Sequence, residues 1–167
     1  MRRFWVLLLV TSAITASQVM VTAQRATAPA AGAKATPRII DIEATDEMKF
    51  SVTTITAKPG ETLRVRLKAV SKGNLPKVAM AHNFVLFKAA ATPKQLNDFM
   101  MITVTKGAVT FIPPEMKDLV IASTAMAGAG ETVDVTFTVP TAPGSYPYIC
   151  SFSTHYLIGM KGTLVVK

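Results

Sequence analysis

Hydrophobic and polar residues alternate along several short stretches of the chain, and residues 62–70 are the clearest example. In an extended chain, Leu63, Val65 and Leu67 lie on one side there, and the three basic residues at 64, 66 and 68 lie on the other. A period of two predicts a β-strand with one face in a hydrophobic core and the other in water.

Similar runs of β-branched and aromatic residues recur through residue 167, with Pro- and Gly-containing turn signals between them. They predict further strands at 40–43, 50–56, 84–86, 119–124, 132–139, 146–150 and 162–167. Between these strands, Thr92 and Pro93 supply a helix N-cap and first turn, which predicts a short helix over 93–102. Residues 106–114 are predicted to be irregular, because Gly107 and a Pro-Pro pair interrupt any periodicity. The pattern as a whole predicts an all-β fold, a β-sandwich with one short inserted helix.

Residues 1–23 have the features of a secretory signal peptide. Two arginines are followed by an apolar run over 4–10, and residues 21–23 form a small-residue cleavage site. The alternatives are an uncleaved N-terminal anchor, which alone would associate the protein with a membrane, and a twin-arginine signal. Residues 24–38 contain no large apolar residue and predict a flexible Ala/Pro/Thr-rich leader, which leaves 39–167 as one domain.

The charge of the chain is concentrated at its N-terminus. The formal net charge is +8, but five of the 18 basic residues precede Ile39, and none of the 10 acidic residues does. The predicted domain therefore carries only +3, and it lacks the interleaved aromatic and basic residues of a nucleic-acid interface, so we expect no nucleic-acid partner.

The counts of metal-binding residues exclude several classes of protein. One cysteine rules out an intrachain disulfide and any Cys-rich zinc or iron–sulfur site. Two histidines are too few for a multicopper oxidase or a copper nitrite reductase. No nucleophile–base pair, paired acids or phosphate loop is present, and we interpret the chain as a non-enzyme.

The single cysteine and both histidines fall in a pattern typical of a metal site. Cys150, His155 and Met160 lie within eleven residues, between two predicted strands, and His82 lies at the start of a distant strand. Taken singly, each of these residue types is more often a core or surface residue. Together, one thiolate and two imidazoles with a weak axial thioether form a blue-copper electron-transfer site. We therefore predict one copper ion bound by His82, Cys150, His155 and Met160.

Three segments, 73–86, 119–137 and 150–167, resemble the cupredoxins, and among them the azurins and auracyanins. The most specific motifs are Leu-Pro-Lys before His-Asn and the closing Met-Lys-Gly-Thr-Leu. The resemblance implies a Greek-key β-sandwich, a type 1 copper ion and the same four ligands. It further implies that Asn83 braces the ligand loop through Ser151, and that the backbone N–H of Phe152 tunes the cysteine sulfur.

Three departures from the azurin pattern limit what the resemblance implies. Ala81 replaces the glycine whose carbonyl approaches the metal in azurins, so that contact is not expected to carry over. Four residues, 156–159, separate His155 from Met160 where azurins have three, so neither the copper–Met distance nor the reduction potential carries over. The azurin disulfide is also missing, a loss of about 3 kcal/mol if nothing compensates.

These observations predict an exported, periplasmic protein that shuttles single electrons between redox partners. We expect the electrons to pass through an exposed edge of His155, surrounded by an apolar docking face of Ala81, Ala125, Met126, Tyr156, Leu157 and Ile158. The alternatives are a copper-binding or copper-delivery protein without a redox role, and a metal-free β-sandwich adhesion or interaction module with a reactive thiol.

Overall fold

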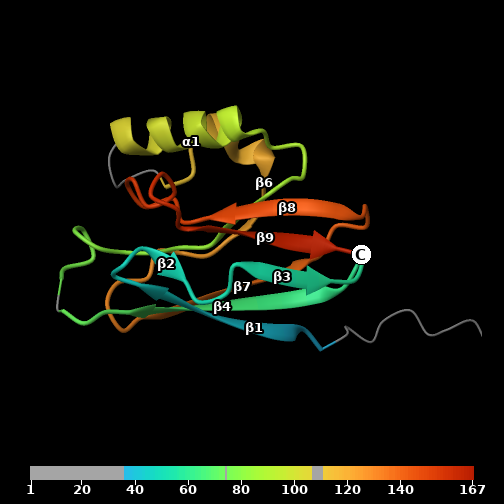
Figure 1. The fold of residues 1–167 in the computed structure, drawn as a ribbon, viewed down its shortest axis with the longest axis horizontal. Helices are drawn as coiled ribbons and strands as arrows, with labels where there is room; N and C mark the ends of the chain where they lie inside the picture. Colours follow the sequence, from blue (N-terminus) through green and yellow to red (C-terminus); the bar gives the residue numbers. More distant parts are fainter. Residues whose placement is uncertain (1–35, 74, 107–110) are drawn as a thin grey trace, which may run out of the picture. The chain divides into compact units, whose positions relative to one another are not determined.

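The structure is a computed structural model that describes residues 36–73, 75–106 and 111–167. The predicted signal peptide and nearly all of the predicted leader lie outside the described residues. The described chain forms two β-sheets and two short helical segments (Figure 1). The elements are β1 (Arg38–Thr45), β2 (Lys49–Phe50), β3 (Thr54–Ala57), β4 (Thr62–Val70), β5 (Val85–Phe87), α1 (Pro93–Thr105), the 3-10 helix η1 (Pro114–Leu119), β6 (Val120–Ser123), β7 (Thr132–Thr138), β8 (Gly144–Ile149) and β9 (Lys161–Val166).

The first sheet has the strand order β2-β1-β4-β7 and one face in water. β4 runs parallel to β1 and antiparallel to β7. The alternation predicted for residues 62–70 is confirmed, because Leu63, Val65 and Leu67 are 0% exposed while the basic residues between them are exposed.

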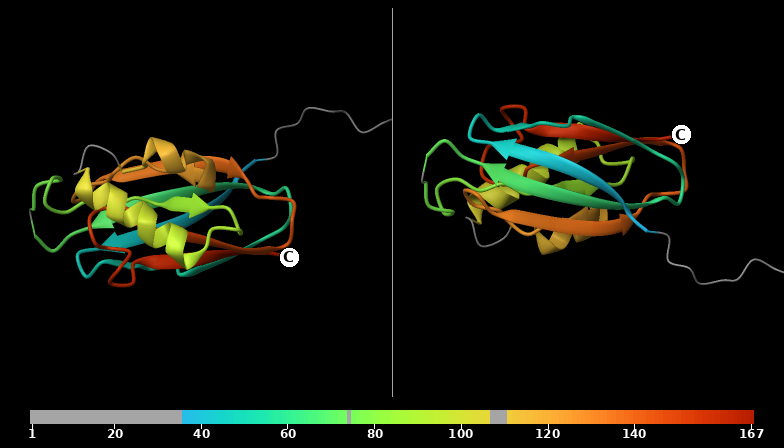
Figure 2. Two further views of the ribbon diagram at one scale, coloured as in Figure 1. Left: turned by 90° about the horizontal axis from the view of Figure 1, so that it is seen from above. Right: turned by 90° about the horizontal axis from the view of Figure 1, so that it is seen from below.

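The second sheet has the order β3-β9-β8-β5-β6 and is covered on both faces near β5. Leu86 packs in the core between the sheets, while Val85 and Phe87 pack with residues of α1 on the opposite side. All three residues of β5 are buried for this reason. Figure 2 shows α1 lying across this sheet, with the strands of the first sheet on the far side of the molecule. The predicted β-sandwich with one inserted helix is confirmed.

The inserted helix begins where the sequence predicts and runs three residues further. Thr92 caps α1 with a capping box, accepting a hydrogen bond from the backbone of Gln95. Within this C-terminal extension, Thr103 is buried and donates its hydroxyl hydrogen to the carbonyl of Met100 at 2.8 Å. The 3-10 helix η1 was not predicted; it begins at Pro114, at the end of the stretch predicted to be irregular.

The prediction of one strand over 50–56 is wrong, because the chain changes sheets within it. β2 pairs with β1, whereas β3 pairs with β9 in the other sheet. Backbone groups of the segment that crosses between the sheets form hydrogen bonds with a residue of each sheet. Ser51 N–H donates to the carbonyl of Glu43 in the first sheet, and the Tyr148 hydroxyl of the second sheet donates to the carbonyl of Val52 at 2.6 Å. Strand propensity is the same for both sheets, so the sequence pattern did not reveal the break.

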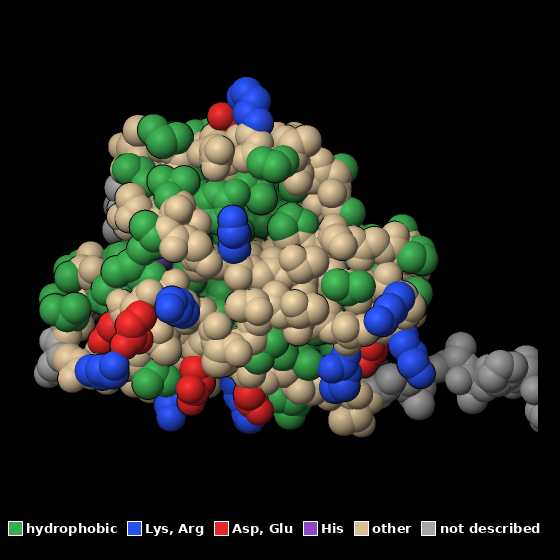
Figure 3. Space-filling model, viewed as in Figure 1, with side chains coloured by type: hydrophobic (Ala, Val, Ile, Leu, Met, Phe, Trp, Pro, Cys, Tyr) green, Lys and Arg blue, Asp and Glu red, His purple; other side chains and the backbone are tan. Residues whose placement is uncertain are grey.

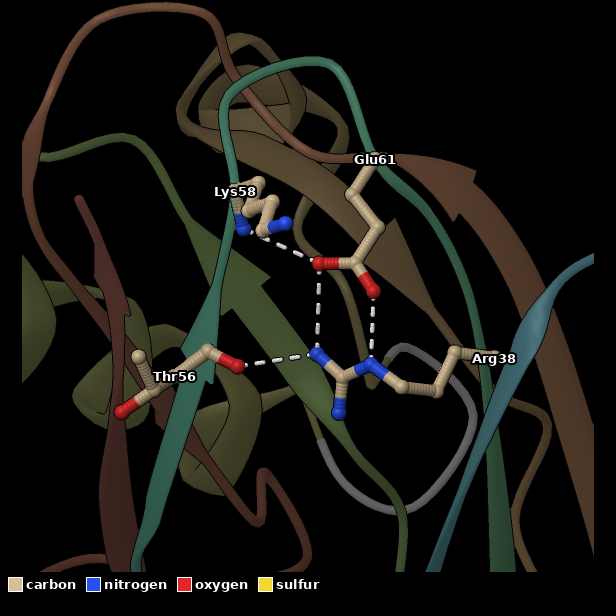
Figure 4. A network of polar contacts seen from close by, with 4 residues as sticks. All are labelled: Arg38, Thr56, Lys58 and Glu61. Atoms are coloured by element: carbon tan, nitrogen blue, oxygen red, sulfur yellow. Dashed lines mark hydrogen bonds and ion pairs between the residues drawn. The ribbon is translucent and has the colours of Figure 1, made fainter.

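Hydrogen bonds of Arg38 tie the start of β1 to the turn between β3 and β4 (Figure 4). Its guanidinium donates to both carboxylate oxygens of Glu61, at 2.6 and 3.3 Å, and to the Thr56 carbonyl at 2.8 Å. Glu61 also accepts from the backbone N–H of Lys58. Arg38 is therefore part of the folded domain, one residue before the boundary expected from the sequence.

β8 runs away from the end of the domain where the C-terminus lies, and β9 returns to it (Figure 1). The loop 150–160 between them therefore lies at the opposite end. Among the helices of the described residues, none is long and apolar enough to cross a membrane.

Candidate metal centre

Backbone pairing places the four predicted ligands at one end of the sandwich. His82 precedes β5 and forms an isolated bridge with Ala127, with hydrogen bonds of 2.9 and 2.8 Å in the two directions. Cys150 directly follows β8, and Met160 directly precedes β9. Turns over residues 151–159 bring His155 back beside Cys150.

The side chains of His82, Cys150 and His155 converge. One ligand atom from each lies within 4.8 Å of the other two. The Cys150 sulfur is 3.5 Å from Nδ1 of His155, and the two imidazole ring centroids are 5.0 Å apart. This confirms that residues far apart in the sequence meet in one buried cluster.

Met160 belongs to the same structural unit and is completely buried. Its backbone N–H donates to the carbonyl of His155 at 3.0 Å, and its carbonyl accepts from the N–H of Cys150 at 3.1 Å. The four predicted ligands therefore lie near one another at the same end of the domain.

Burial keeps the three converging side chains uncharged when no cation is bound. It raises the pKa of the Cys150 thiol to about 11, against a lowering by hydrogen bonds from the backbone of Asn83 and Phe152. Burial, and after it the charge of the neighbouring His82, lowers the pKa of His155 to about 4. Burial also lowers the pKa of His82, partly offset by Asp46. Two neutral imidazoles beside a thiol of this kind suit a cation that would stabilise the thiolate.

Both ring nitrogens of His82 are buried and have no hydrogen-bond partner within the protein. Buried polar atoms are paired in most proteins, and leaving one unpaired costs about 1–3 kcal/mol. A metal bound to one of these nitrogens removes that cost. The residues present therefore fit a copper ion, which thiolate, imidazole and thioether ligands select.

A reciprocal pair of hydrogen bonds joins the segment carrying His82 to the loop carrying Cys150. Asn83 donates from Nδ2 to the Ser151 hydroxyl at 2.9 Å, and its Oδ1 accepts from the Ser151 backbone N–H at 2.8 Å. Both residues are buried, so the bonds are shielded from water. The expected brace between Asn83 and Ser151 is confirmed. The backbone of Phe152 also lowers the pKa of the Cys150 thiol, in the direction expected of a group that tunes the sulfur.

The surface around the site differs from the expected docking face. Ala81 and Tyr156 are buried, and His155 is only 4% exposed, which leaves no broad exposed edge. Leu157 and Ile158 are exposed as expected, at 52% and 60%.

Two further exposed hydrophobic residues, Leu75 and Val78, lie in the segment that leads to His82 and were not predicted to be part of this surface. Val78 is 80% exposed. Figure 3 shows hydrophobic side chains gathered at this end of the domain. Apolar residues next to a predicted ligand, in a stretch without strand or helix periodicity, are the sequence feature that could have predicted this exposed surface.

A β-sandwich that buries one cysteine, two histidines and a methionine at one end has the architecture of a type 1 copper protein. Residues 38–167 match the family of copper-binding proteins described as the plastocyanin/azurin family. The chain belongs to this family, whose cofactor is copper and whose members are electron-transfer proteins.

Individual relatives agree with this assignment. The chain is 40% identical to auracyanin-B of Chloroflexus aurantiacus over 128 residues, which are 74% of this chain and 49% of auracyanin-B. It therefore spans about half the length of that relative. It is 37% identical to azurin of Pseudomonas fluorescens biotype C over 131 residues, 77% of this chain and 97% of the azurin.

Solved structures show the same fold. The reduced auracyanin of Roseiflexus castenholzii has a TM-score of 0.66 and 28% identity, over 77% of this chain and 96% of that one. Auracyanin A of Chloroflexus aurantiacus, a "blue" copper protein, has a TM-score of 0.65 and 31% identity, over 79% of this chain and all of that one.

Proposed function

We propose that this protein is an exported electron carrier that binds one type 1 copper ion through His82, Cys150, His155 and Met160 and exchanges single electrons with redox partners. The observation that supports it most directly is the burial of the two imidazoles and the thiol within 4.8 Å of one another, with both His82 nitrogens unpaired. Copper, when bound, supplies the one-electron couple. The protein holds the ligands, excludes water from them and limits their movement.

Rigidity of the ligand set is the main contribution of the fold. His82 is fixed by its bridge to Ala127, and Cys150 by its hydrogen bond to the carbonyl of Met160. The Asn83–Ser151 pair locks the two ligand-bearing segments together. Ligands that keep their positions in both oxidation states reduce the rearrangement that accompanies electron transfer.

Redox partners are proposed to dock on a hydrophobic surface formed by Leu75, Val78, Leu157 and Ile158, here called the docking face. Nearby lysines are paired with acids: Lys77 with Glu131 and Lys72 with Glu47, both at 2.6 Å. A small apolar face with little unpaired charge suits brief, weak encounters. The same proposal includes a cleaved signal over 1–23, a leader from residue 24 to the start of β1, periplasmic localisation and no enzymatic activity.

The burial of the ligands favours electron transfer over copper delivery. A delivery protein must pass its metal to a partner, whereas Cys150 and Met160 are 0% exposed and His155 is almost fully covered. A metal-free module is also disfavoured, because a buried thiol with a raised pKa is a poor nucleophile.

A visible absorption spectrum tests the proposal. The Cu(II)-loaded protein is expected to show an intense thiolate-to-copper band, and Cys150→Ser is expected to lose it. Rapid electron self-exchange, measured by NMR line broadening in mixtures of oxidised and reduced protein, would separate an electron carrier from a delivery protein. A colourless Cu(II) complex of the wild-type protein would contradict the proposal.

A further inference from the structure

Asp46 lies in the turn between β1 and β2 and is anchored to the residues that follow β4, the strand next to β1 in the same sheet. Its Oδ2 accepts hydrogen bonds from the Ser71 hydroxyl at 2.8 Å and from the Lys72 backbone N–H at 2.9 Å. Both donors directly follow β4, at the start of the segment that leads to His82. These two bonds fix the orientation of the carboxylate.

The second oxygen of this carboxylate has no partner. In the described part of the chain, three buried side-chain nitrogen or oxygen atoms lack a hydrogen bond: Oδ1 of Asp46 and both ring nitrogens of His82. A copper ion bound through one His82 nitrogen leaves the other as a buried N–H donor. A buried acceptor and a buried donor, each without a partner in the protein, therefore remain.

The two groups lie along one path of the chain, because Thr45 pairs with Val70 at the end of β4 and the segment after β4 leads to His82. Burial lowers the pKa of His82, and the Asp46 carboxylate opposes that effect. The pKa of Asp46 is lowered, first by the Ser71 hydroxyl and further by the Lys72 amide and by His82, against the effect of burial. The charge on each residue therefore shifts the pKa of the other.

We propose that Asp46 is a positioning residue for the copper site, accepting a hydrogen bond through one bridging water from the ring nitrogen of His82 that does not bind the metal. This inference rests on the proposed function, in which His82 is a ligand. A carboxylate in this role sets the tautomer and orientation of the imidazole and makes it a stronger donor to the metal. Among the residues described, Asp46 is the acid that combines an unpaired buried oxygen with an electrostatic effect on His82.

The negative charge stabilises Cu(II) more than Cu(I), because the oxidised ion carries one more positive charge. Loss of such a partner costs about 10–100-fold in metal affinity. We expect Asp46→Asn to lower the affinity for Cu(II) about tenfold more than the affinity for Cu(I). For a one-electron couple, that ratio corresponds to a rise in reduction potential of about 59 mV.

The experiment compares Asp46→Asn with Glu47→Gln, a matched control. Glu47 is the next residue in the same turn, is exposed, and pairs with Lys72 Nζ. Both variants remove one negative charge, and the introduced asparagine keeps an oxygen that can accept from Ser71 and Lys72. Voltammetry is expected to show a raised potential in Asp46→Asn and an unchanged one in Glu47→Gln. Equal potentials in the two variants would overturn the proposal.

A second measurement uses the metal-free protein. The ¹⁵N chemical shifts of the His82 ring are expected to report one dominant tautomer in the wild type and a mixture in Asp46→Asn. A purely structural role for Asp46 would lower the melting temperature and leave the tautomer unchanged, which would overturn the inference. This test needs no copper, so it can fail or succeed independently of the proposed function. Failure of the proposed function would instead appear as a Cu(II)-loaded wild-type protein without the thiolate-to-copper band.

Discussion

Replacing Asn83 with alanine is expected to destabilise the protein by about 4 kcal/mol. The substitution removes two buried hydrogen bonds to Ser151, of 2.8 and 2.9 Å. A typical bond contributes about 1 kcal/mol net, and a buried group left without a partner costs about 1–3 kcal/mol. Two lost bonds and the Ser151 backbone N–H left buried and unpaired account for that total.

Ser151→Ala is the informative partner variant. It removes only the hydroxyl, so the bond from the Ser151 backbone N–H to Asn83 persists and one amide hydrogen of Asn83 is left unpaired. We expect a loss of about 2 kcal/mol. The double variant Asn83→Ala/Ser151→Ala is expected to be no less stable than Asn83→Ala alone, because the hydroxyl has already lost its partner.

Urea denaturation of the metal-free proteins, followed by circular dichroism, measures these free energies of unfolding. Asn97→Ala, at an exposed position on α1, is the control and is expected to stay within about 0.5 kcal/mol of the wild type. A loss below about 1 kcal/mol for Asn83→Ala, or simple additivity of the two substitutions, would refute the bracing role.

Three further outcomes are expected from the structure. Gly162→Ala would place a methyl carbon in steric overlap with the ring of the buried Tyr148, and we expect it to lower the free energy of unfolding by about 3 kcal/mol. An unchanged denaturation midpoint would contradict this packing. The pKa of Glu61 is lowered, chiefly by its hydrogen bond from Arg38, so this pair stabilises the fold above the unfolded-state value of about 4.3 and loses its effect as the pH falls through the lowered folded-state value. Melting temperatures of the wild type and Arg38→Met are expected to converge in that acidic range, and a constant difference would argue against the linkage. Leu157→Asp, in the docking face, is expected to slow electron self-exchange at least about tenfold without moving the visible band, whereas an unchanged rate would locate the docking surface elsewhere.

The alternation of the β4 segment was sufficient to predict its strand and its buried face. Successive side chains of a strand point to opposite faces, so in a half-buried sheet the apolar set must face the core. The start of α1 was also predicted from the sequence, since Thr92 and Pro93 determine the first turn through local interactions. The change of sheet between β2 and β3 could not be predicted from the sequence. It depends on which strands pair, and strand propensity does not distinguish one pairing partner from another.

The chemistry of the site follows from composition. One cysteine and two histidines in the chain leave few ways to build a metal centre, and their order along the chain with Met160 predicts copper. The brace between Asn83 and Ser151 was predicted only through a family resemblance. Hydrogen bonding between two loops depends on how the strands bring them together, which no local pattern encodes.

Only the tertiary structure determined which residues near the metal site are exposed to solvent. Ala81 and Tyr156 are predicted on the docking face and are buried, while Leu75 and Val78, which the sequence analysis does not predict there, are exposed. It also revealed the unpaired oxygen of Asp46, which nothing in the sequence connects with His82. By itself the sequence determined the strands, the fold class and the ligand types, because these depend on local periodicity and on residue chemistry. The tertiary structure decided burial, hydrogen-bond partners and the shape of the surface, because these depend on the packing of segments that are distant along the chain.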